Sequence, residues 1–349
     1  HPRLRRALIL QRLQAESCVI FHTPQEKLSV RTEFASIHSE GLLDFLETAW
    51  GNWVDMGEIG RDHDFIRALE DGSIPNLIPG CYPLPRDPYQ EPSFNVMGQV
   101  GYYCTDDCTP IIAPLWRELE TDTAIVAHAV DQALEKKHAT VYAIPTHPGH
   151  HAAQDSFGGY CYLNQAAHAV KRFQTKLGGD DSSTTPIAVI DVDYHCGNGT
   201  ASIFYSDPSV FVVSIHCDPN YDYPYYSGFA HQKGVQKGLG KTLHLPLPPK
   251  TKMDEYEVAL QSALEAVSSF GPRAAVVSMG LDTHDADPCA LRRAGFCLSG
   301  EDYRNMGHIL ASMADDIPVL FLQEGGYKMD SIAEAATNVL MGFREKRSQ

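Results

Sequence analysis

The sequence is short of positive charge. Its 349 residues include 28 lysines and arginines against 44 aspartates and glutamates, for a formal net charge of −16 at pH 7. Proteins that bind nucleic acid concentrate positive charge, so this balance argues against a nucleic-acid partner. It suits a cationic small molecule or a basic protein segment, and it is equally compatible with an acidic surface that contacts only solvent.

Long apolar runs and a paired cysteine framework are also missing. No run approaches the roughly 20 apolar residues that a membrane-spanning helix needs, so we expect no membrane partner. The nine cysteines lack framework spacing, which favours free thiols and a reducing, cytoplasmic compartment. The sequence shows no secretory signal, although it begins with His1, which is compatible with a trimmed N-terminal targeting segment.

Short, continuously apolar runs alternate with amphipathic helical patterns, of which 163–173 and 253–267 are the clearest. Such runs are typical of strands buried on both faces of a parallel sheet. The alternation predicts an α/β protein with a doubly wound, mostly parallel sheet and helices on both faces. Because no repeat or long linker interrupts it, we expect residues 1–349 to form a single domain. The predicted strands are 140–145, 187–193, 210–216, 274–282 and 319–326.

Polar clusters follow the carboxyl end of every predicted strand. In chain order they read "PGHH", "DVDYH", "SIHCDP", "GLDTHDADP" and "EGGY". Open α/β sheets bind their ligands at that edge. We therefore expect these five separate segments to converge in one crevice.

The second cluster predicts a metal site. Asp191, Asp193 and His195 occupy alternate positions, which in a strand would share one face, while Cys196 would point to the opposite face and into the core. Asp193 and His195 can both reach a metal ion, and Asp282, at the end of a neighbouring strand, is the natural third ligand. Two carboxylates and one imidazole neutralise a divalent cation and leave a position open for substrate, as in catalytic zinc sites.

Two histidines and a tyrosine supply the other parts of a hydrolase. His150 and His151 can divide the work, one as general base and one as electrostatic partner, with Asp191 and Asn198 as candidates to orient them. Tyr327 follows two glycines and can donate a hydrogen bond to a developing oxyanion. Together the parts predict metal-assisted hydrolysis of an acyl derivative.

In this order, the segments resemble the zinc-dependent deacetylase superfamily, which unites histone deacetylases and acetylpolyamine amidohydrolases. The resemblance implies the arginase–deacetylase fold and runs through nearly the whole chain. The asparagine in "GNGT", the "HCDP" after the third strand and Glu324 in "EGGY" favour the acetylpolyamine branch. The matching segments are "IHSEGLLDFLETAW", "GQVGYYCTDDCTPI", "PGHHAAQDSFGGYCYLN", "DVDYHCGNGT", "SIHCDP", "GLDTHDADP" and "EGGY".

The resemblance also implies a role for each motif residue. One zinc ion per chain would bind Asp193, His195 and Asp282, with His151 as the main general base and acid and His150 as its electrostatic partner. Tyr327 would polarise the scissile carbonyl. A structural potassium ion would bind Asp191, Ser214 and the backbone carbonyls of Asp193 and His195. The substrate would contact Tyr160 and Tyr223, as aromatic walls of a tunnel, and Gly159 and Gly325.

Some positions depart from the family pattern. Cys196 stands where the family commonly has a second histidine, and Met97 and Cys108 stand where amidohydrolases carry glutamates at the tunnel mouth, with Asp106 and Asp107 nearby. Amidohydrolases of this branch dimerise and thereby narrow the tunnel. The proline-rich stretch within a probable loop insertion at 74–97 is where a dimer loop would lie, so we expect a homodimer.

Several functions stay open on the sequence alone. The favoured substrate is an N-acetylated primary amine, acetylpolyamine or similar, and the alternative is acetyl-lysine in a protein or peptide. A two-manganese guanidino hydrolase would need an Asp-x-Asp pair, but His284 stands two residues after Asp282. A non-catalytic binder of acetylated amines could dispense with His151 and Tyr327, which are both present.

Overall fold

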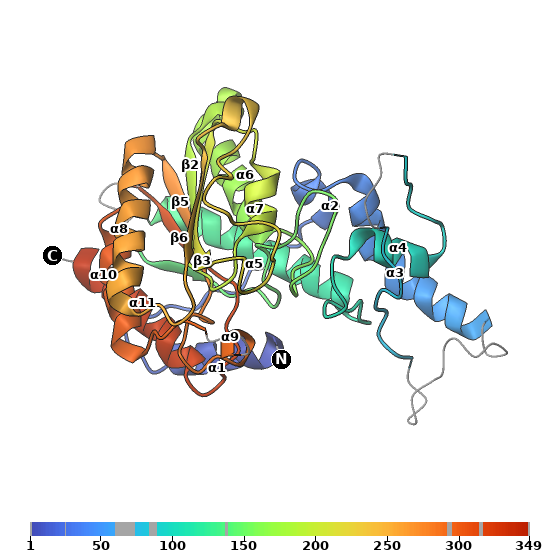
Figure 1. The fold of residues 1–349 in the computed structure, drawn as a ribbon, viewed down its shortest axis with the longest axis horizontal. Helices are drawn as coiled ribbons and strands as arrows, with labels where there is room; N and C mark the ends of the chain where they lie inside the picture. Colours follow the sequence, from blue (N-terminus) through green and yellow to red (C-terminus); the bar gives the residue numbers. More distant parts are fainter. Residues whose placement is uncertain are drawn as a thin grey trace.

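Six parallel strands form one sheet in the order β1-β6-β5-β2-β3-β4 (Figure 1). The chain moves outward from β2 through β3 to β4, and later from β5 to β6 on the other side, so the winding direction reverses between β2 and β5. Open α/β sheets form a ligand crevice at such a switch point. The strands are β1 (Val141–Ala143), β2 (Ile187–Asp191), β3 (Val210–Cys217), β4 (Thr242–Leu247), β5 (Ala274–Met279) and β6 (Val319–Gln323).

These features come from a computed structural model. It describes residues 2–24, 26–59, 74–83, 89–136, 139–291, 295–313 and 317–347. Within these ranges, no helix is both long enough and apolar enough to cross a membrane.

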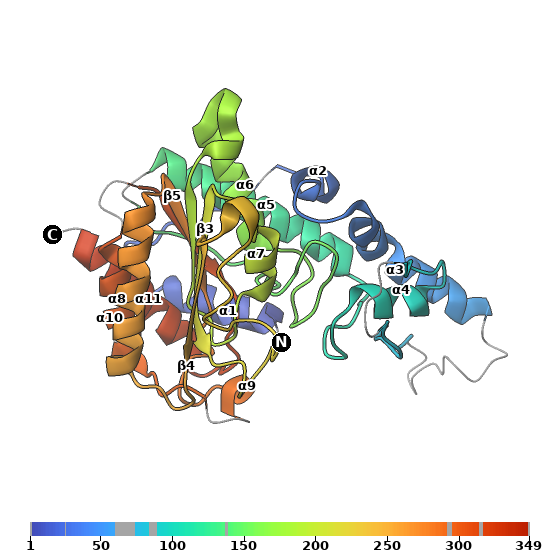
Figure 2. The same ribbon diagram turned by 45° about the horizontal axis from the view of Figure 1, so that its top comes forward.

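The central strands are buried on both faces, as their apolar sequences predicted. In β2, Ile187 and Val189 face one hydrophobic cluster, whereas Ala188 and Ile190 face another. The first cluster lies against α5 and α6, and the second lies against α8, α10 and α11 (Figures 1 and 2). The predicted two-sided sheet is therefore confirmed. The helices on these faces are α5 (Leu115–Glu135), α6 (Gln165–Gly178), α7 (Asn198–Ile203), α8 (Met253–Phe270), α10 (Gly300–Ala311) and α11 (Ile332–Arg347).

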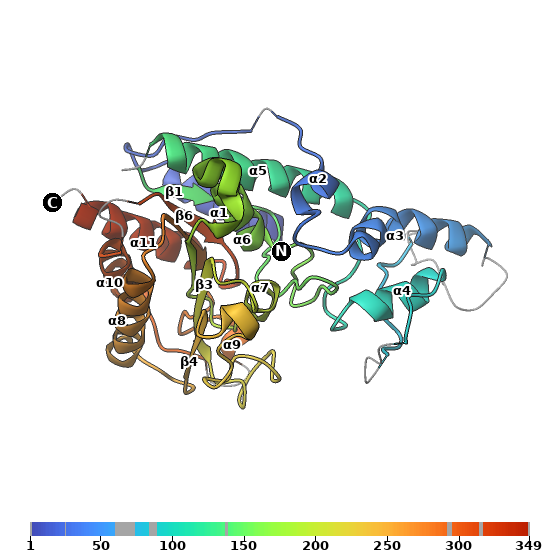
Figure 3. The ribbon, with the colours of Figure 1, turned by 90° about the horizontal axis from the view of Figure 1, so that it is seen from above.

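The N-terminal part of the chain contributes to both sides of the molecule. Helix α1 (Pro2–Leu13) packs on α11 and places Ile9 and Leu13 in the second cluster. Helices α3 (Glu40–Ile59) and α4 (Val96–Tyr103) pack on each other and project away from the sheet in all three views (Figure 3). The remaining elements are the short helices α2 (Val30–Phe34) and α9 (Pro288–Leu291) and the 3-10 helices η2 (Gly179–Thr184) and η3 (Gln236–Gly238).

Strand β2 is shorter than the sequence predicted. Its pairing ends at Asp191. The amide of Asp193 then donates to Asp191 Oδ1 at 3.1 Å, and the amide of His195 donates to Asp193 Oδ1 at 2.9 Å. Bonds from an Asp side chain to the backbone two residues on turn the chain out of the extended conformation. The prediction that Asp191, Asp193 and His195 share one face of a strand is therefore wrong.

Other boundaries also differ from the prediction. The strands that were expected to reach residues 282 and 326 end at Met279 and Gln323, before the glycines that follow them. Strand β4 was not among the predicted strands. Its sequence "TLHLPL" contains a proline, which sheets accept on an edge strand such as this one. Of the insertion expected at 74–97, residues 74–83 and 89–95 are described and belong to no helix or named strand, and residues 84–88 lie outside the described residues.

Candidate active site

A cavity of ≈460 Å³ opens at the carboxyl edge of the sheet, beside the switch point between β2 and β5. Its wall combines the segments after β1, β2, β5 and β6 with loops at 106–108, 159–160 and 222–225. The volume suits a small ligand. Five sequence-predicted clusters were expected to form one crevice, and segments from four of them line this cavity.

Three of the predicted metal ligands lie together at its base. One ligand atom from each of Asp193, His195 and Asp282 lies within 4.8 Å of the other two. His195 Nδ1 is 3.0 Å from Asp282 Oδ2 and 3.3 Å from Asp193 Oδ1. Burial disfavours the charged imidazole, but these two carboxylates raise the pKa of His195 well above its usual range. The site therefore attracts a positive charge.

Glycines surround the two carboxylates and suit them to a divalent ion. A Cβ atom on Gly280 would lie 2.1 Å from Asp193 Oδ2, and one on Gly325 would lie 2.5 Å from the same oxygen and 2.6 Å from Asp282 Oδ2. The amide of Gly325 donates to Asp193 Oδ2 at 2.8 Å. Both acids are thus held by backbone that approaches them closely, while Asp193 Oδ1 and Asp282 Oδ2 face the imidazole. A zinc-type donor set of two carboxylates and one imidazole fits here.

His150 carries a positive charge. Its Nδ1 atom lies 2.9 Å from Asp191 Oδ2, and its Nε2 atom lies 3.8 Å from Asp193 Oδ1. Burial opposes the charge, but the carboxylates of Asp193 and Asp191 outweigh it and raise the pKa of His150 to about 10. A buried imidazolium at this place can stabilise negative charge that develops in the cavity.

His151 is neutral, although its ring centroid lies only 4.0 Å from that of His150. Burial, and then the positive charges on His150 and His195, hold the pKa of His151 well below its usual range. Its Nδ1 atom donates to Asn198 Oδ1 at 2.7 Å, which leaves Nε2 unprotonated. The two histidines therefore differ in charge because one pairs with a carboxylate and the other with an amide.

Glu324 holds the loop that carries both histidines. Its Oε2 atom accepts from the amides of Gly149 and His150 at 2.6 and 3.2 Å, and its Oε1 atom accepts from Ser278 Oγ at 3.1 Å. Burial raises the pKa of this carboxyl to about 7. In the sequence, Glu324 stood out only as a residue that favours the acetylpolyamine branch. The structure shows that its carboxylate holds the loop on which His150 and His151 lie.

Tyr327 is anchored by residues that the sequence did not single out. The buried carboxylate of Asp287 accepts from the amides of Tyr327 and Lys328 at 2.6 and 2.9 Å. Arg5, buried on α1, places its guanidinium carbon 5.8 Å from the centroid of the Tyr327 ring. Burial raises the pKa of this phenol well above its usual range, so it keeps its proton. Asp287 belongs to the "DADP" motif, but nothing in the sequence connects Arg5 with the site.

Aromatic rings wall the cavity. Tyr223 lies edge-on to His151, with ring centroids 4.8 Å apart, and Tyr160 lies 5.7 Å from Tyr327. Gly159 is required between them because its φ is +57° and a Cβ there would lie 2.3 Å from His151 Cδ2. The predicted substrate contacts Gly159, Tyr160 and Tyr223 thus lie at the cavity.

The tunnel-mouth positions differ in their placement. Cys108 lines the cavity, whereas Met97 packs against the first hydrophobic cluster. Asp106 also lines the cavity, but its carboxylate accepts from the amides of Gly159 and Cys108 and so holds the loop. Asp222 is a second acid in the cavity wall, which the sequence reading missed.

The potassium ligands predicted from the resemblance lie on neighbouring strands. Asp191 of β2 is in register with Ser214 of β3. The hydroxyl of Ser214 accepts from the amide of Gly197 at 3.3 Å and lies 2.8 Å from His216 Nδ1.

Cys196 is buried as predicted, but its surroundings are polar. It belongs to neither hydrophobic cluster, and its Sγ atom lies 3.6 Å from His244 Nδ1. The predicted burial is confirmed, but the strand alternation from which it was argued is not present, because β2 ends at Asp191.

Comparison with known proteins gives consistent matches. The histone deacetylase domain family matches residues 2–343. Acetylpolyamine amidohydrolase 2 of Pseudomonas aeruginosa is 36% identical over 307 residues, which cover 88% of this chain and 81% of that protein. Acetylpolyamine amidohydrolase of Mycoplana ramosa is 35% identical over 308 residues, again 88% of this chain and 81% of that protein.

A solved structure extends the likeness to three dimensions. The crystal structure of an acetylpolyamine aminohydrolase from Burkholderia pseudomallei matches with a TM-score of 0.81 and 27% identity, over 98% of this chain and 90% of that one. The predicted arginase–deacetylase fold is thereby confirmed.

Proposed function

The chain belongs to the histone deacetylase family of hydrolytic deacetylases, and we propose that it releases acetate from N-acetylated polyamines or similar small amines. The observation that carries this proposal is the cavity, in which two carboxylates and an imidazole that could hold a metal ion lie with a neutral histidine and a buried phenol. The names of the two acetylpolyamine amidohydrolases support the amine as substrate.

We propose that the catalytic site of each chain binds one zinc ion, on Asp193, His195 and Asp282. When bound, a divalent ion neutralises the two buried carboxylates and polarises the amide carbonyl of the substrate. The glycines around the acids support this assignment, because their backbone leaves no room for side chains between the ligands. A structural potassium ion at Asp191 and Ser214 is part of the same proposal.

The side chains of the cavity divide the proton transfers. His151 Nε2 takes a proton from the attacking water, because this ring is neutral and its Nδ1–H is held by Asn198. The charged His150 stabilises the negative charge that develops nearby. The phenol of Tyr327 donates a hydrogen bond to the carbonyl oxygen as it becomes an oxyanion. His151 then returns the proton to the amine that leaves.

The charge of the cavity wall supports a cationic amine. Asp106 and Asp222 line it, and the described lining residues include no lysine or arginine. Aromatic walls at Tyr160 and Tyr223 suit the alkyl chain and ammonium of a polyamine. Acetyl-lysine in a histone-type substrate presents the same kind of alkyl chain, so the aromatic rings suit both substrates. The two acids in the wall favour the polyamine, because its free amine end is positively charged.

We also propose a homodimer through the insertion at 74–97. In its described parts Ile78, Tyr89 and Phe94 are 50%, 83% and 100% exposed, and exposed apolar side chains of this size are available to a partner surface. A cytoplasmic, reducing location is supported by the nine cysteines, which lack the spacing of a paired disulfide framework.

A substrate series tests the function. We expect kcat/KM for acetylputrescine and acetylspermidine to exceed that for acetyl-lysine peptides, with the purified zinc-loaded protein. Turnover of peptides alone would contradict the polyamine assignment and leave the deacetylase chemistry in place.

A phenol variant tests the chemistry itself. Tyr327→Phe should lower kcat by about 10²–10³, the effect of removing one oxyanion donor. Because the hydroxyl contributes to the transition state rather than to ground-state binding, KM should change little. Unchanged kcat would remove Tyr327 from the mechanism.

A further inference from the structure

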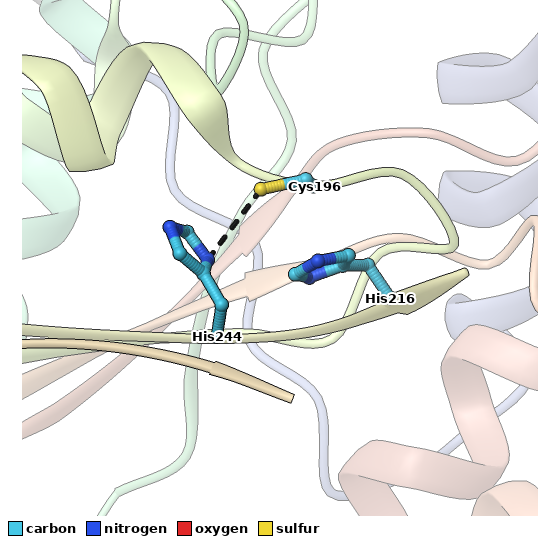
Figure 4. Close-up of side chains that lie close together, drawn as sticks. All are labelled: Cys196, His216 and His244. Carbon is cyan, nitrogen blue, oxygen red and sulfur yellow. Dashed lines mark hydrogen bonds between the residues drawn. The ribbon is translucent and has the colours of Figure 1, made fainter. Parts of the chain in front are cut away.

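A second group of metal-ligand side chains lies outside the catalytic cavity. One ligand atom from each of Cys196, His216 and His244 lies within 4.8 Å of the other two. His216 comes from β3 and His244 from β4, on adjacent parallel strands, and Cys196 comes from the loop after β2. All three are buried, none lines the cavity, and they converge on a common space (Figure 4).

We propose that this group is a second metal site, which binds a thiophilic cation such as Zn²⁺ independently of the catalytic ion. A thiolate and two imidazoles form a donor set that selects zinc and similar metals over magnesium or calcium. The proposal does not depend on the deacetylase function, because it uses none of the ligands assigned to the catalytic site.

The spacing of the donor atoms supports a shared ion. Cys196 Sγ lies 3.6 Å from His244 Nδ1. In tetrahedral zinc sites, bond lengths of about 2.3 Å to sulfur and about 2.0–2.1 Å to nitrogen place two such ligands about 3.6 Å apart. The two atoms thus already have the separation that a common tetrahedral ion would impose.

The surroundings of His216 can orient it as a ligand. Its Nδ1 atom lies 2.8 Å from Ser214 Oγ, and its Nε2 atom lies 2.9 Å from the carbonyl oxygen of Gly228. Metal-binding histidines usually donate their other ring N–H to such an outer partner. Because a carbonyl oxygen only accepts, His216 Nε2–H donates to Gly228 and the ring keeps its lone pair on Nδ1, beside the Ser214 hydroxyl. The carbonyl of Gly228 is thus the outer partner that fixes the ring, and Nδ1 is the nitrogen that can bind the cation.

Gly228 packs closely against two of the proposed ligands. Its φ is +107°, and a Cβ there would lie 2.6 Å from His216 Nε2 and 3.0 Å from Cys196 Sγ. The loop therefore approaches both ligands so closely that only glycine fits, and it brings a carbonyl oxygen beside them. Binding of the cation displaces the proton of the Cys196 thiol to solvent as the metal–sulfur bond forms.

Cobalt substitution tests the site, because the proposed catalytic ligands contain no sulfur. After the full-length protein is stripped of metal and loaded with Co²⁺, we expect a near-ultraviolet sulfur-to-cobalt charge-transfer band and two metal ions per chain by elemental analysis. Cys196→Ser should abolish the band and lower the content to one ion. Cys217→Ser, at another buried cysteine, is the matched control and should keep both.

Two further variants separate this site from the catalytic one. His244→Asn should lose the same ion and band as Cys196→Ser, which guards against loss through misfolding of one variant, with circular dichroism as the check. Asp282→Asn should lose the other ion and keep the band. A wild-type protein that binds one cobalt ion per chain without the band would overturn the proposal, whatever its deacetylase activity.

Discussion

At the scale of single residues, the site depends on charging only one of two adjacent histidines. His150 and His151 share one buried loop, so burial disfavours a charge on both of them. The carboxylate of Asp191 offsets this cost for His150, whereas the amide of Asn198 only orients His151. The partner of each ring therefore decides its role. His150, paired with a carboxylate, already carries its second proton, whereas His151, paired with an amide, can accept one.

The proposed proton acceptor, His151, can be replaced without removing a proposed zinc ligand. We expect His151→Gln to lower kcat by about 10²–10⁴, the usual contribution of a positioned general base. Because His151 does not belong to the proposed zinc ligands, the zinc content by elemental analysis should stay at the wild-type value. Loss of zinc together with activity would show instead that the side chain supports the metal.

A buried histidine away from the cavity makes stability depend on pH. His38 bridges the carbonyl of Ala153 and the amide of Asn164, and burial lowers its pKa from 6.5 to about 4. Between these two values the unfolded chain binds a proton that the folded chain does not, so stability falls as the pH falls from about 6.5 to about 4.

This linkage can be measured by denaturation. The shift at His38 corresponds to a loss of roughly 3 kcal/mol across that range. We expect the urea midpoint to decrease on acidification, and to decrease less steeply in His38→Gln, which removes one of the titrating groups. An equal slope in the variant and the wild type would contradict the assignment.

At the scale of elements, the ends of the strands build the site. Asp side chains bond to the backbone after β2 and turn it, so that Asp193 and His195 leave the sheet and meet Asp282 from β5. The segment after β6 then approaches both carboxylates through Gly325. The positions of the proposed zinc ligands therefore depend on where β2, β5 and β6 end and on how the chain turns after them.

The close approach after β6 predicts the effect of one methyl group. Gly325→Ala would place a Cβ 2.5 Å from Asp193 Oδ2 and 2.6 Å from Asp282 Oδ2, which forces the carboxylates apart. We expect zinc affinity to fall by about 10–100-fold, as for other groups that hold metal ligands in place. Competition with a chromogenic chelator measures the affinity.

A glycine with free space provides the control for this variant. A Cβ on Gly51 of α3 would meet no atom within 4 Å. Gly51→Ala should therefore leave zinc affinity at the wild-type value. If both variants lost zinc equally, the contact at Gly325 would not be the cause.

At the scale of the whole molecule, the net negative charge increases the rate at which a cationic substrate reaches the protein. A net charge of −16 creates a field that attracts a polyamine over distances set by salt. The screening length falls from about 30 Å at 0.01 M to about 3 Å at 1 M ionic strength.

The field predicts a salt dependence that follows substrate charge. Over that range of ionic strength we expect kcat/KM for acetylspermidine to fall by roughly tenfold, because steering acts on association. An acetyl-lysine peptide without net charge should change much less. Equal salt dependence for the two substrates would exclude a role of the field in selecting a cationic amine.

The sequence by itself determined the class of the fold and most of the residues that meet at the cavity. Apolar runs define strands that are buried on both faces, and polar clusters after parallel strands must gather at one edge of the sheet. These local patterns predict five of the strands. They also predict the site residues His150, His151, Asp193, His195, Asp282 and Tyr327. The edge strand β4, with its proline and half-buried side chains, lacks such a pattern.

Only the tertiary structure decided which atoms touch. Asx turns after β2 and the winding of the sheet bring Cys196 beside His216 and His244, and α1 brings Arg5 beside Tyr327. Contacts between residues this far apart along the chain depend on strand order and on where each strand ends. A periodic pattern describes one element at a time, so it contains no information on these distances.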